Sequence, residues 1–210
     1  MITDPGPKAI GACMMTADKL KCPELKNVIP PMNSIHDTLH RVFGLREFRP
    51  YQQEIIEQAM NGGDAIVLMP TGGGKSLCYQ IAALHRRGMG IVVSPLISLM
   101  KDQVDALQAN GVRAAMYNST LNKQEARRVL GEIQSGAVDI LYVAPERMMR
   151  PGFINDLACI PLSLIAIDEA HCVSQWGHDF GPEYAARGAL RRSFPALPVM
   201  ALTAPADPQT

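Results

Sequence analysis

The chain reads Met69-Pro70-Thr71-Gly72-Gly73-Gly74-Lys75-Ser76 directly after an apolar run at residues 65–68 and before the helix-compatible segment Leu77–Arg86. A strand, a glycine-rich turn and a helix that opens with Lys-Ser form the pattern of a phosphate-binding loop. Glycines let backbone N–H groups approach an anion without a Cβ in the way, and the helix N-terminus adds partial positive charge. This stretch therefore predicts a P-loop fold.

Each residue type in this loop has a predicted task. Residues 71–74 would surround the phosphates with backbone donors. Lys75 would reach the β- and γ-phosphates, and the Ser76 hydroxyl would coordinate Mg²⁺. We therefore expect the chain to bind a nucleoside triphosphate. The alternative is a glycine turn without a ligand, which Met69 favours because the general pattern has glycine at that position.

Length, charge and cysteines set the broad class of the protein. Its 210 residues suffice for one domain with a sizeable core. No apolar run is long enough to span a bilayer, and residues 1–7 lack the layout of a secretion signal, so we expect a cytoplasmic location without membrane contact. Five cysteines without a C-x-x-C pair indicate reduced thiols rather than a zinc site. Because the formal net charge is zero, any contact with nucleic acid must be local or completed by another domain.

The chain divides at about residue 34. Prolines punctuate residues 1–33, which predicts a poorly ordered tail. Ser34 is a candidate N-cap for a helix that stops near Gly44, and a second helix is predicted from Pro50 to Met60 with Pro50 in its first turn. We expect one domain over residues 34–207.

From residue 65 onward, strand-like runs alternate with helix-compatible stretches. This alternation predicts the α/β class, with right-handed crossovers and a parallel sheet covered by helices on both faces. The predicted strands are Ala65–Met69, Ile91–Ser94, Arg113–Tyr117, Ile140–Val143, Leu164–Ile167 and Val199–Leu202. The predicted helices between them are Leu77–Arg86, Ile97–Ala109, Lys123–Ser135, Gly152–Leu157 and Pro182–Ser193. Such sheets bind ligands beyond the carboxyl ends of their strands, where the polar motifs of this chain fall.

A second motif, Asp168-Glu169-Ala170-His171, follows the predicted strand at residues 164–167. Mg²⁺ prefers oxygen ligands and keeps several waters, so Asp168 can hold it directly or through water. Glu169 can polarise an attacking water, and His171 can link the site to neighbouring elements. The alternative is a solvated acidic turn, and the upstream P-loop favours the metal site instead.

Taken together, these two motifs resemble those of superfamily-two helicases, and three further segments are similar to RecQ-type DNA helicases. Residues 43–52 resemble the adenine-reading motif of that family, and residues 94–104 resemble its motif that begins Ser-Pro-Leu. Residues 172–180 are similar to the aromatic-rich loop that joins DNA binding to ATP hydrolysis. The resemblance runs from about residue 39 to residue 207 and implies a RecA-like ATP-binding domain.

The resemblance also assigns roles to single residues. It implies ATP and Mg²⁺ as cofactors, with Gln52 reading the adenine edge and Arg49 stacking on the base. It implies single-stranded and partly duplex DNA as partner, with Ser94, Pro95 and Lys101 near the DNA backbone.

The DNA track includes further residues by the same resemblance. Residues 142–147 would line it. Trp176 and Phe180 would meet single-stranded bases or transmit their arrival, because aromatic faces stack with any base. For Trp176 the alternative is ordinary core packing.

The implied function is that of the ATP-binding half of a 3′-to-5′ helicase, which couples ATP hydrolysis to strand unwinding in DNA repair and recombination. Four positions depart from the family: Leu45 replaces a stacking aromatic, Tyr51 a glycine, Gly181 an arginine, and Pro205 the second threonine of Thr-Ala-Thr.

We expect this chain to lack the second RecA-like domain of the family that it resembles, which supplies an arginine finger that typically contributes about 10³–10⁵ in rate. We therefore expect the isolated chain to bind nucleotide weakly and hydrolyse it slowly. The alternative is a truncated or degenerate helicase paralogue that binds nucleotide or nucleic acid without turnover. A P-loop kinase or GTPase is disfavoured, because the sequence has no Asn-Lys-x-Asp signature.

Overall fold

The computed structural model describes residues 34–148, 150, 152–170 and 191–205. The predicted tail at residues 1–33 and the segment at residues 171–190 lie outside the described residues. His171, Trp176, Phe180 and Gly181 belong to that second segment.

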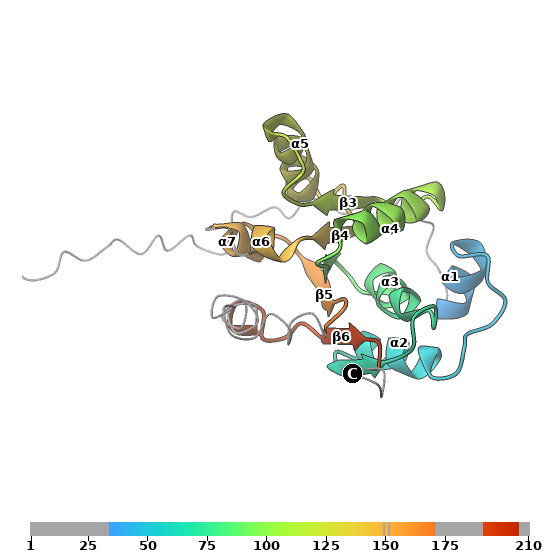
Figure 1. Ribbon diagram of the computed structural model, residues 1–210. Coiled ribbons are helices and arrows are strands. Elements are labelled where there is room, and N and C mark those ends of the chain that lie inside the picture. The colour runs from blue at the N-terminus through green and yellow to red at the C-terminus, as the bar shows by residue number, and fades with distance from the viewer. Residues whose placement is uncertain (1–33, 149, 151, 171–190, 206–210) are drawn as a thin grey trace, which may run out of the picture.

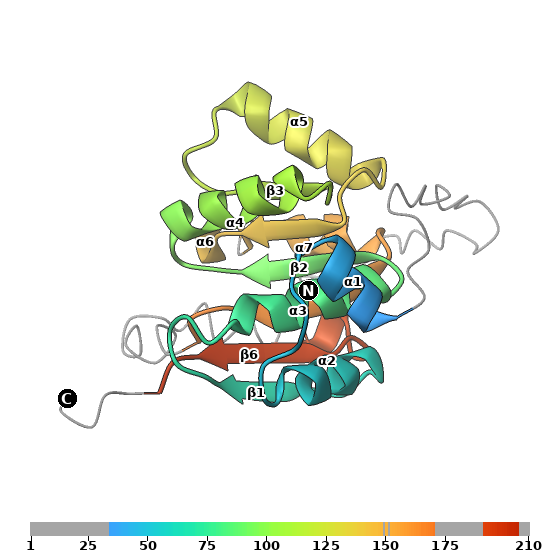
Figure 2. The ribbon, with the colours of Figure 1, turned by 90° about the vertical axis from the view of Figure 1, so that its right-hand side faces the viewer.

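The described residues form a six-stranded sheet in which every pairing is parallel, with strand order β1-β6-β5-β2-β4-β3. All the strand arrows point the same way in Figure 2, so the carboxyl ends of the strands share one edge. The strands are β1 Ala65–Leu68, β2 Met89–Val93, β3 Ala114–Tyr117, β4 Ile140–Val143, β5 Leu162–Ile167 and β6 Val199–Thr203. The predicted α/β class with a parallel sheet is confirmed.

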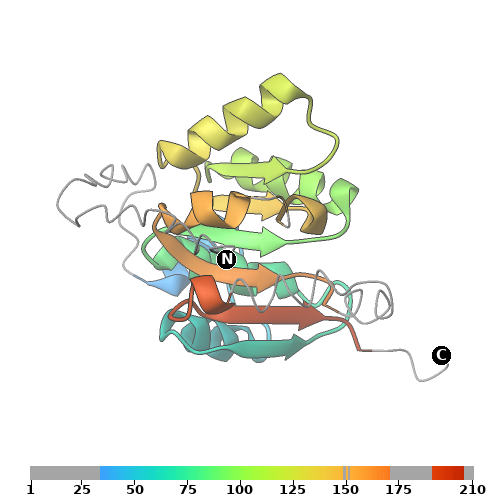
Figure 3. The same ribbon diagram turned by 90° about the vertical axis from the view of Figure 1, so that its left-hand side faces the viewer.

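Helices cover both faces of this sheet (Figure 1). One face carries α1 Ile35–Arg41, α2 Gln52–Met60, α3 Lys75–His85 and α4 Ile97–Ala109. The opposite face carries α5 Lys123–Gln134, α6 Pro145–Met148 and α7 Phe153–Ala158, which face the viewer in Figure 3. In the described part of the chain, every helix is too short or too polar to cross a bilayer.

Two apolar cores, one on each face, hold these layers together. Strand β4 supplies both: Ile140 and Tyr142 enter the core beneath α1–α4, whereas Leu141 and Val143 enter the core beneath α5–α7. All four side chains of β4 are buried, as expected of a central parallel strand. Burial on both faces explains why this strand reads as one continuous apolar run.

Strand β2 begins at Met89, earlier than the predicted Ile91. A Cβ on Gly90 would lie 2.6 Å from the Cβ of Ala83, so glycine is required where α3 packs closely on this strand. Because this glycine interrupts the apolar run, a prediction based on such runs placed the start of the strand too late.

The start of α2 also differs from the prediction. Pro50 lies outside the helix, and Tyr51 is its N-cap in the left-handed region at φ 68°. Helix α6 is a further difference, because the predicted elements did not include it.

Candidate functional site

Buried polar side chains collect at the carboxyl edge of the sheet. Lys75 and Asp168 follow β1 and β5, and Ser94 and Asn118 follow β2 and β3. All four are buried. Burying a polar group costs free energy unless it gains a partner, so such a concentration at one edge marks a candidate site.

The glycines of the loop between β1 and α3 are structurally required. Gly72 and Gly74 have φ angles of 76° and 84°, in the left-handed region that side chains disfavour. A Cβ on Gly73 would lie 2.8 Å from the carbonyl oxygen of Pro70, and one on Gly74 would lie 2.4 Å from Nε2 of Gln52. The loop is therefore a close-fitting backbone cradle, as a phosphate site requires.

Helix α3 opens at this cradle. Its N-cap, Gly74, provides no side-chain cap to the first N–H groups of the helix, which leaves the positive end of the helix dipole for an anion. Lys75 is the first helical residue and is only 8% exposed. Its Nζ donates to the carbonyl oxygens of Met69 at 3.1 Å and Pro70 at 3.5 Å, so the ammonium lies inside the loop.

The predicted adenine motif contacts the same loop. The Gln52 side chain accepts the Arg49 N–H at 2.8 Å through Oε1 and donates to the carbonyl oxygen of Gly74 at 3.1 Å through Nε2. The Arg49 guanidinium donates to the carbonyl oxygen of Gly72. Gln52 is 2% exposed, so its amide is directed into the protein and supports the glycine loop.

Asp168 is held at the end of β5 by the hydrogen bond that its N–H donates to the Val93 carbonyl, at 2.9 Å. Burial raises the pKa of its carboxyl to about 6, and the neighbouring Glu169 adds to the rise. The Glu169 N–H, which donates to Oδ1 at 3.1 Å, and the Lys75 ammonium lower this pKa. Asp168 and Lys75 therefore interact electrostatically.

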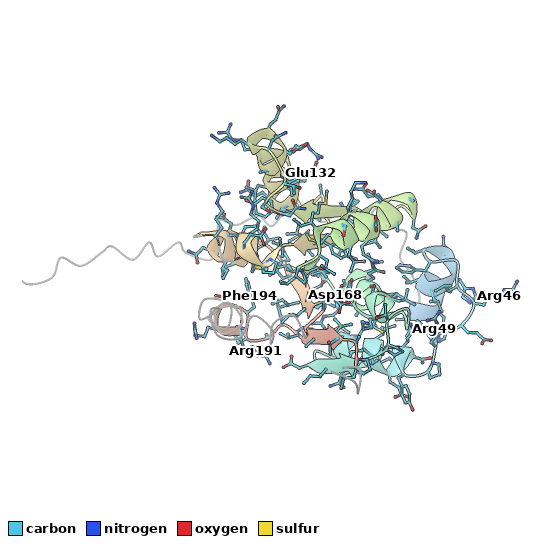
Figure 4. All side chains as sticks on the ribbon, viewed as in Figure 1. Arg46, Arg49, Glu132, Asp168, Arg191 and Phe194 are labelled. Carbon is cyan, nitrogen blue, oxygen red and sulfur yellow. The ribbon has the colours of Figure 1, made fainter. Side chains whose placement is uncertain are left out.

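The donor set at this edge fits a magnesium-bound triphosphate. Ser76 is half-buried in the first turn of α3, and both Ser76 and Asp168 interact with the hydroxyl of Tyr79. Figure 4 shows Asp168 near the middle of the molecule, whereas Arg46 points away from it. Among the described residues no three His, Cys, Asp or Glu side chains form a metal cluster, so a cation here would need oxygens from a ligand as well.

The residues that the resemblance assigns to DNA binding differ in how exposed their side chains are. Ser94 is 1% exposed at the end of β2 and its Oγ has no hydrogen-bond partner among the described residues, while Pro95 is half-buried. Lys101 lies on the exposed side of α4 and pairs with Asp105 at 3.2 Å. Tyr142 was expected along the DNA track, but it is 1% exposed and belongs to the core. Trp176 and Phe180 lie outside the described residues.

Sequence reasoning missed Asn118, which is fully buried directly after β3. Its Oδ1 accepts hydrogen bonds from the Thr120 N–H at 3.0 Å and the Thr120 hydroxyl at 2.7 Å, while Nδ2 has no partner in the part of the chain that the structure describes. Its position after a predicted strand was the available signal, since polar residues at that edge line ligand sites.

The family described as DEAD/DEAH box helicase matches residues 49–210. The chain belongs to this family. It is 50% identical over 182 residues to the ATP-dependent DNA helicase RecQ of Pasteurella multocida, and 50% identical over 173 residues to that of Bacillus subtilis. It is 42% identical over 188 residues to the mouse ATP-dependent DNA helicase Q1. These alignments cover 87%, 81% and 86% of the chain, and the chain spans 29% of the length of each relative.

Solved structures agree on the fold. The helicase MrfA matches with a TM-score of 0.64 at 18% identity, over 82% of this chain and 29% of that one. A hypothetical ATP-dependent RNA helicase from Sulfolobus tokodaii matches with a TM-score of 0.64 at 18% identity, over 85% of this chain and 52% of that one. The RecA-like fold expected from the sequence is confirmed.

Proposed function

We propose that this chain is the ATP-binding domain of a RecQ-type 3′-to-5′ DNA helicase and that it uses ATP and Mg²⁺. This proposal is supported by Lys75, which lies inside the glycine cradle and lowers the pKa of Asp168, and by Tyr79, on which both Ser76 and Asp168 act. Relatives at 50% identity that are named ATP-dependent DNA helicases support the substrate assignment.

The chemistry would be in-line attack of water on the terminal phosphate. Lys75 would stabilise the charge that develops on the transferred group, and Glu169 would orient the attacking water. Bound Mg²⁺ would neutralise charge on the phosphate oxygens. Gln52 and Arg49 would keep the loop in its binding shape through their bonds to Gly74 and Gly72.

DNA, single-stranded or partly duplex, would bind at the carboxyl edge near Ser94 and Pro95. A second RecA-like domain would complete both the strand track and the catalytic site, since an arginine supplied across the cleft contributes about 10³–10⁵ in rate. Strand unwinding in repair and recombination would then follow from ATP-driven closure of two such domains.

Titration of the purified chain with a fluorescent ATP analogue tests the nucleotide site. We expect saturable binding that depends on Mg²⁺ and is abolished by Lys75→Ala. Lys123→Ala is the matched control, because Lys123 is the first residue of α5 as Lys75 is of α3, but is exposed. Absence of a saturable signal from folded wild-type chain would overturn the proposal.

A DNA-stimulated ATPase assay, with a second RecA-like domain supplied, separates turnover from binding alone. We expect stimulation that Lys75→Ala abolishes. Nucleotide binding without any turnover in this assay would instead favour the degenerate paralogue.

A further inference from the structure

A string of buried polar side chains begins beneath the candidate metal site. Tyr79 lies one helical turn after Ser76 on α3, so the two side chains share one side of the helix, and Tyr79 is fully buried. The Ser76 side chain acts on the Tyr79 hydroxyl and lowers its pKa. The Tyr79 and Tyr142 hydroxyls lie 3.3 Å apart, and the two rings meet edge to face at 6.4 Å between centroids. The string therefore joins the P-loop helix to the centre of the sheet.

Gln80 and Gln103 form the far end of the string. Nε2 of Gln80 donates to the Tyr142 hydroxyl at 2.9 Å and to Oε1 of Gln103 at 2.8 Å, which uses both of its hydrogens. The Tyr142 oxygen therefore accepts from Gln80, while either hydroxyl can donate across the contact between Tyr79 and Tyr142. The Ser76 side chain lowers the pKa of Tyr79, as a donor to its oxygen does, and this direction leaves the lone pairs of Ser76 for a cation.

Ordinary packing does not require this polar string. A phenylalanine at either tyrosine position would fill the same volume without a hydroxyl to satisfy, and a buried hydroxyl without a partner destabilises the fold. Burial raises the pKa of both tyrosines, that of Tyr142 to about 12, and the charge of Asp168 adds to the rise in each. Both groups stay protonated and act only as neutral hydrogen-bond partners near the carboxylate.

We propose that Tyr79 and Tyr142 are positioning residues for the metal site, which hold the Ser76 hydroxyl with a lone pair directed at the cation that Asp168 shares. This inference rests on the proposed function, because it assumes that Ser76 coordinates Mg²⁺. Outer groups that orient metal ligands typically change metal affinity about 10- to 100-fold when they are removed.

The test compares Tyr79→Phe and Tyr142→Phe with Tyr117→Phe in the full 210-residue chain. Tyr117 is the matched control, because it is also fully buried but its hydroxyl accepts from Arg150, at 3.0 Å. Each protein is titrated with a fluorescent ATP analogue at a series of Mg²⁺ concentrations and again in EDTA. We expect the Mg²⁺ concentration at half-saturation to rise about tenfold in both test variants. Affinity in EDTA should stay at the wild-type value, and the control should match wild type in both conditions.

Several results would overturn the inference. An unchanged Mg²⁺ requirement in folded Tyr79→Phe and Tyr142→Phe would show that the hydroxyls do not orient Ser76. An equal loss of affinity in EDTA would show general damage to the loop. A wild-type chain that bound no nucleotide would overturn the proposed function first, and the wild-type titration alone identifies that case.

If either phenylalanine variant fails to fold, Gln103→Leu tests the inference in its place. It removes the acceptor at the far end of the string and releases Gln80 to turn away from Tyr142. We expect a rise of about threefold in the Mg²⁺ requirement. An unchanged Mg²⁺ requirement in this variant would contradict the proposed positioning role of the two tyrosines.

Discussion

Asp168 combines a proposed function with an expected cost in stability. The pKa of its carboxyl is raised to about 6 from the ordinary value of 3.8, chiefly because burial disfavours the ionised form. Between these two values the folded chain binds more protons at this residue than the unfolded chain does. Its contribution to the free energy of unfolding therefore falls as pH rises from about 4 to about 6, and stays low above that range.

We predict that Asp168→Asn raises the melting temperature of the metal-free chain by a few degrees at pH 7.5–8, because the substitution removes the buried charge. The gain should shrink toward pH 4, where the wild-type carboxyl is protonated in both states. Mg²⁺-dependent nucleotide binding should be lost. Melting curves across pH, in EDTA, provide the measurement.

Asp105→Asn is the control for this prediction, because Asp105 lies in an exposed pair with Lys101 and should shift the melting temperature little. A melting temperature of Asp168→Asn that stayed at or below the wild-type value above pH 6 would contradict the assignment.

Gly74 connects the shape of the loop to the position of Gln52. We predict that Gly74→Ala lowers the free energy of unfolding by more than the roughly 1–2 kcal/mol typical of a left-handed alanine, because its Cβ must also displace the buried Gln52 amide. Nucleotide affinity should fall with it. Denaturant unfolding and nucleotide titration measure both effects.

Gly111→Ala separates backbone strain from the contact with Gln52. Gly111 has a similar φ of 81°, but a Cβ there would meet nothing within 4 Å. It should cost only the strain and leave nucleotide binding unchanged. Equal losses in both variants would show that the Gln52 contact contributes nothing.

Helix α2 is attached to α3 through the side chain at its own first position. Because Gln52 bonds to Gly74 rather than pointing into solvent, its observed contacts support the loop and do not depend on which base is bound. We predict that Gln52→Ala weakens binding of ATP and GTP analogues by similar factors. Gln53→Ala is the control, because the Gln53 side chain bonds to Glu57 at the surface. A loss confined to ATP would mean that the amide turns toward the adenine.

An element can be predicted from the sequence when the residues that determine it are neighbours in the chain. The strand β4 and the loop after β1 were predictable because apolar runs and glycine turns are local patterns. The early start of β2 was not, since Gly90 is dictated by Ala83 on another element. The start of α2 was mispredicted because the side-chain bond from Gln52 to Arg49 and the left-handed Tyr51 override the preference for proline in the first turn.

Some features of the candidate site were likewise predictable from the sequence, and others were not. The position of Lys75 and Asp168 at the same edge of the sheet was predictable, because parallel strands bring their carboxyl ends to one edge. The string from Ser76 through Tyr79 to Tyr142 was not, since the two tyrosines are 63 positions apart and each reads as an ordinary apolar-run residue. Only the packing of α3 on β4 brings them together.

As a whole, the described sheet is open at both edges. Strand β1 pairs only with β6, and β3 only with β4. At the β1 edge, Ile66 is 78% exposed and Leu68 is 65% exposed, while Val67 between them is buried. An exposed apolar edge strand is a site for association between chains, because its backbone groups are unpaired on one side.

We predict that Ile66→Lys reduces concentration-dependent light scattering of the purified chain, because a charged side chain on an edge strand opposes pairing between copies. The free energy of unfolding should change by no more than about 0.5 kcal/mol, since the side chain leaves little contact behind. Leu45→Lys is the control, because Leu45 is 46% exposed but lies away from a strand. Scattering reduced equally by both substitutions would attribute the effect to net charge, and unchanged scattering would show that this edge does not associate.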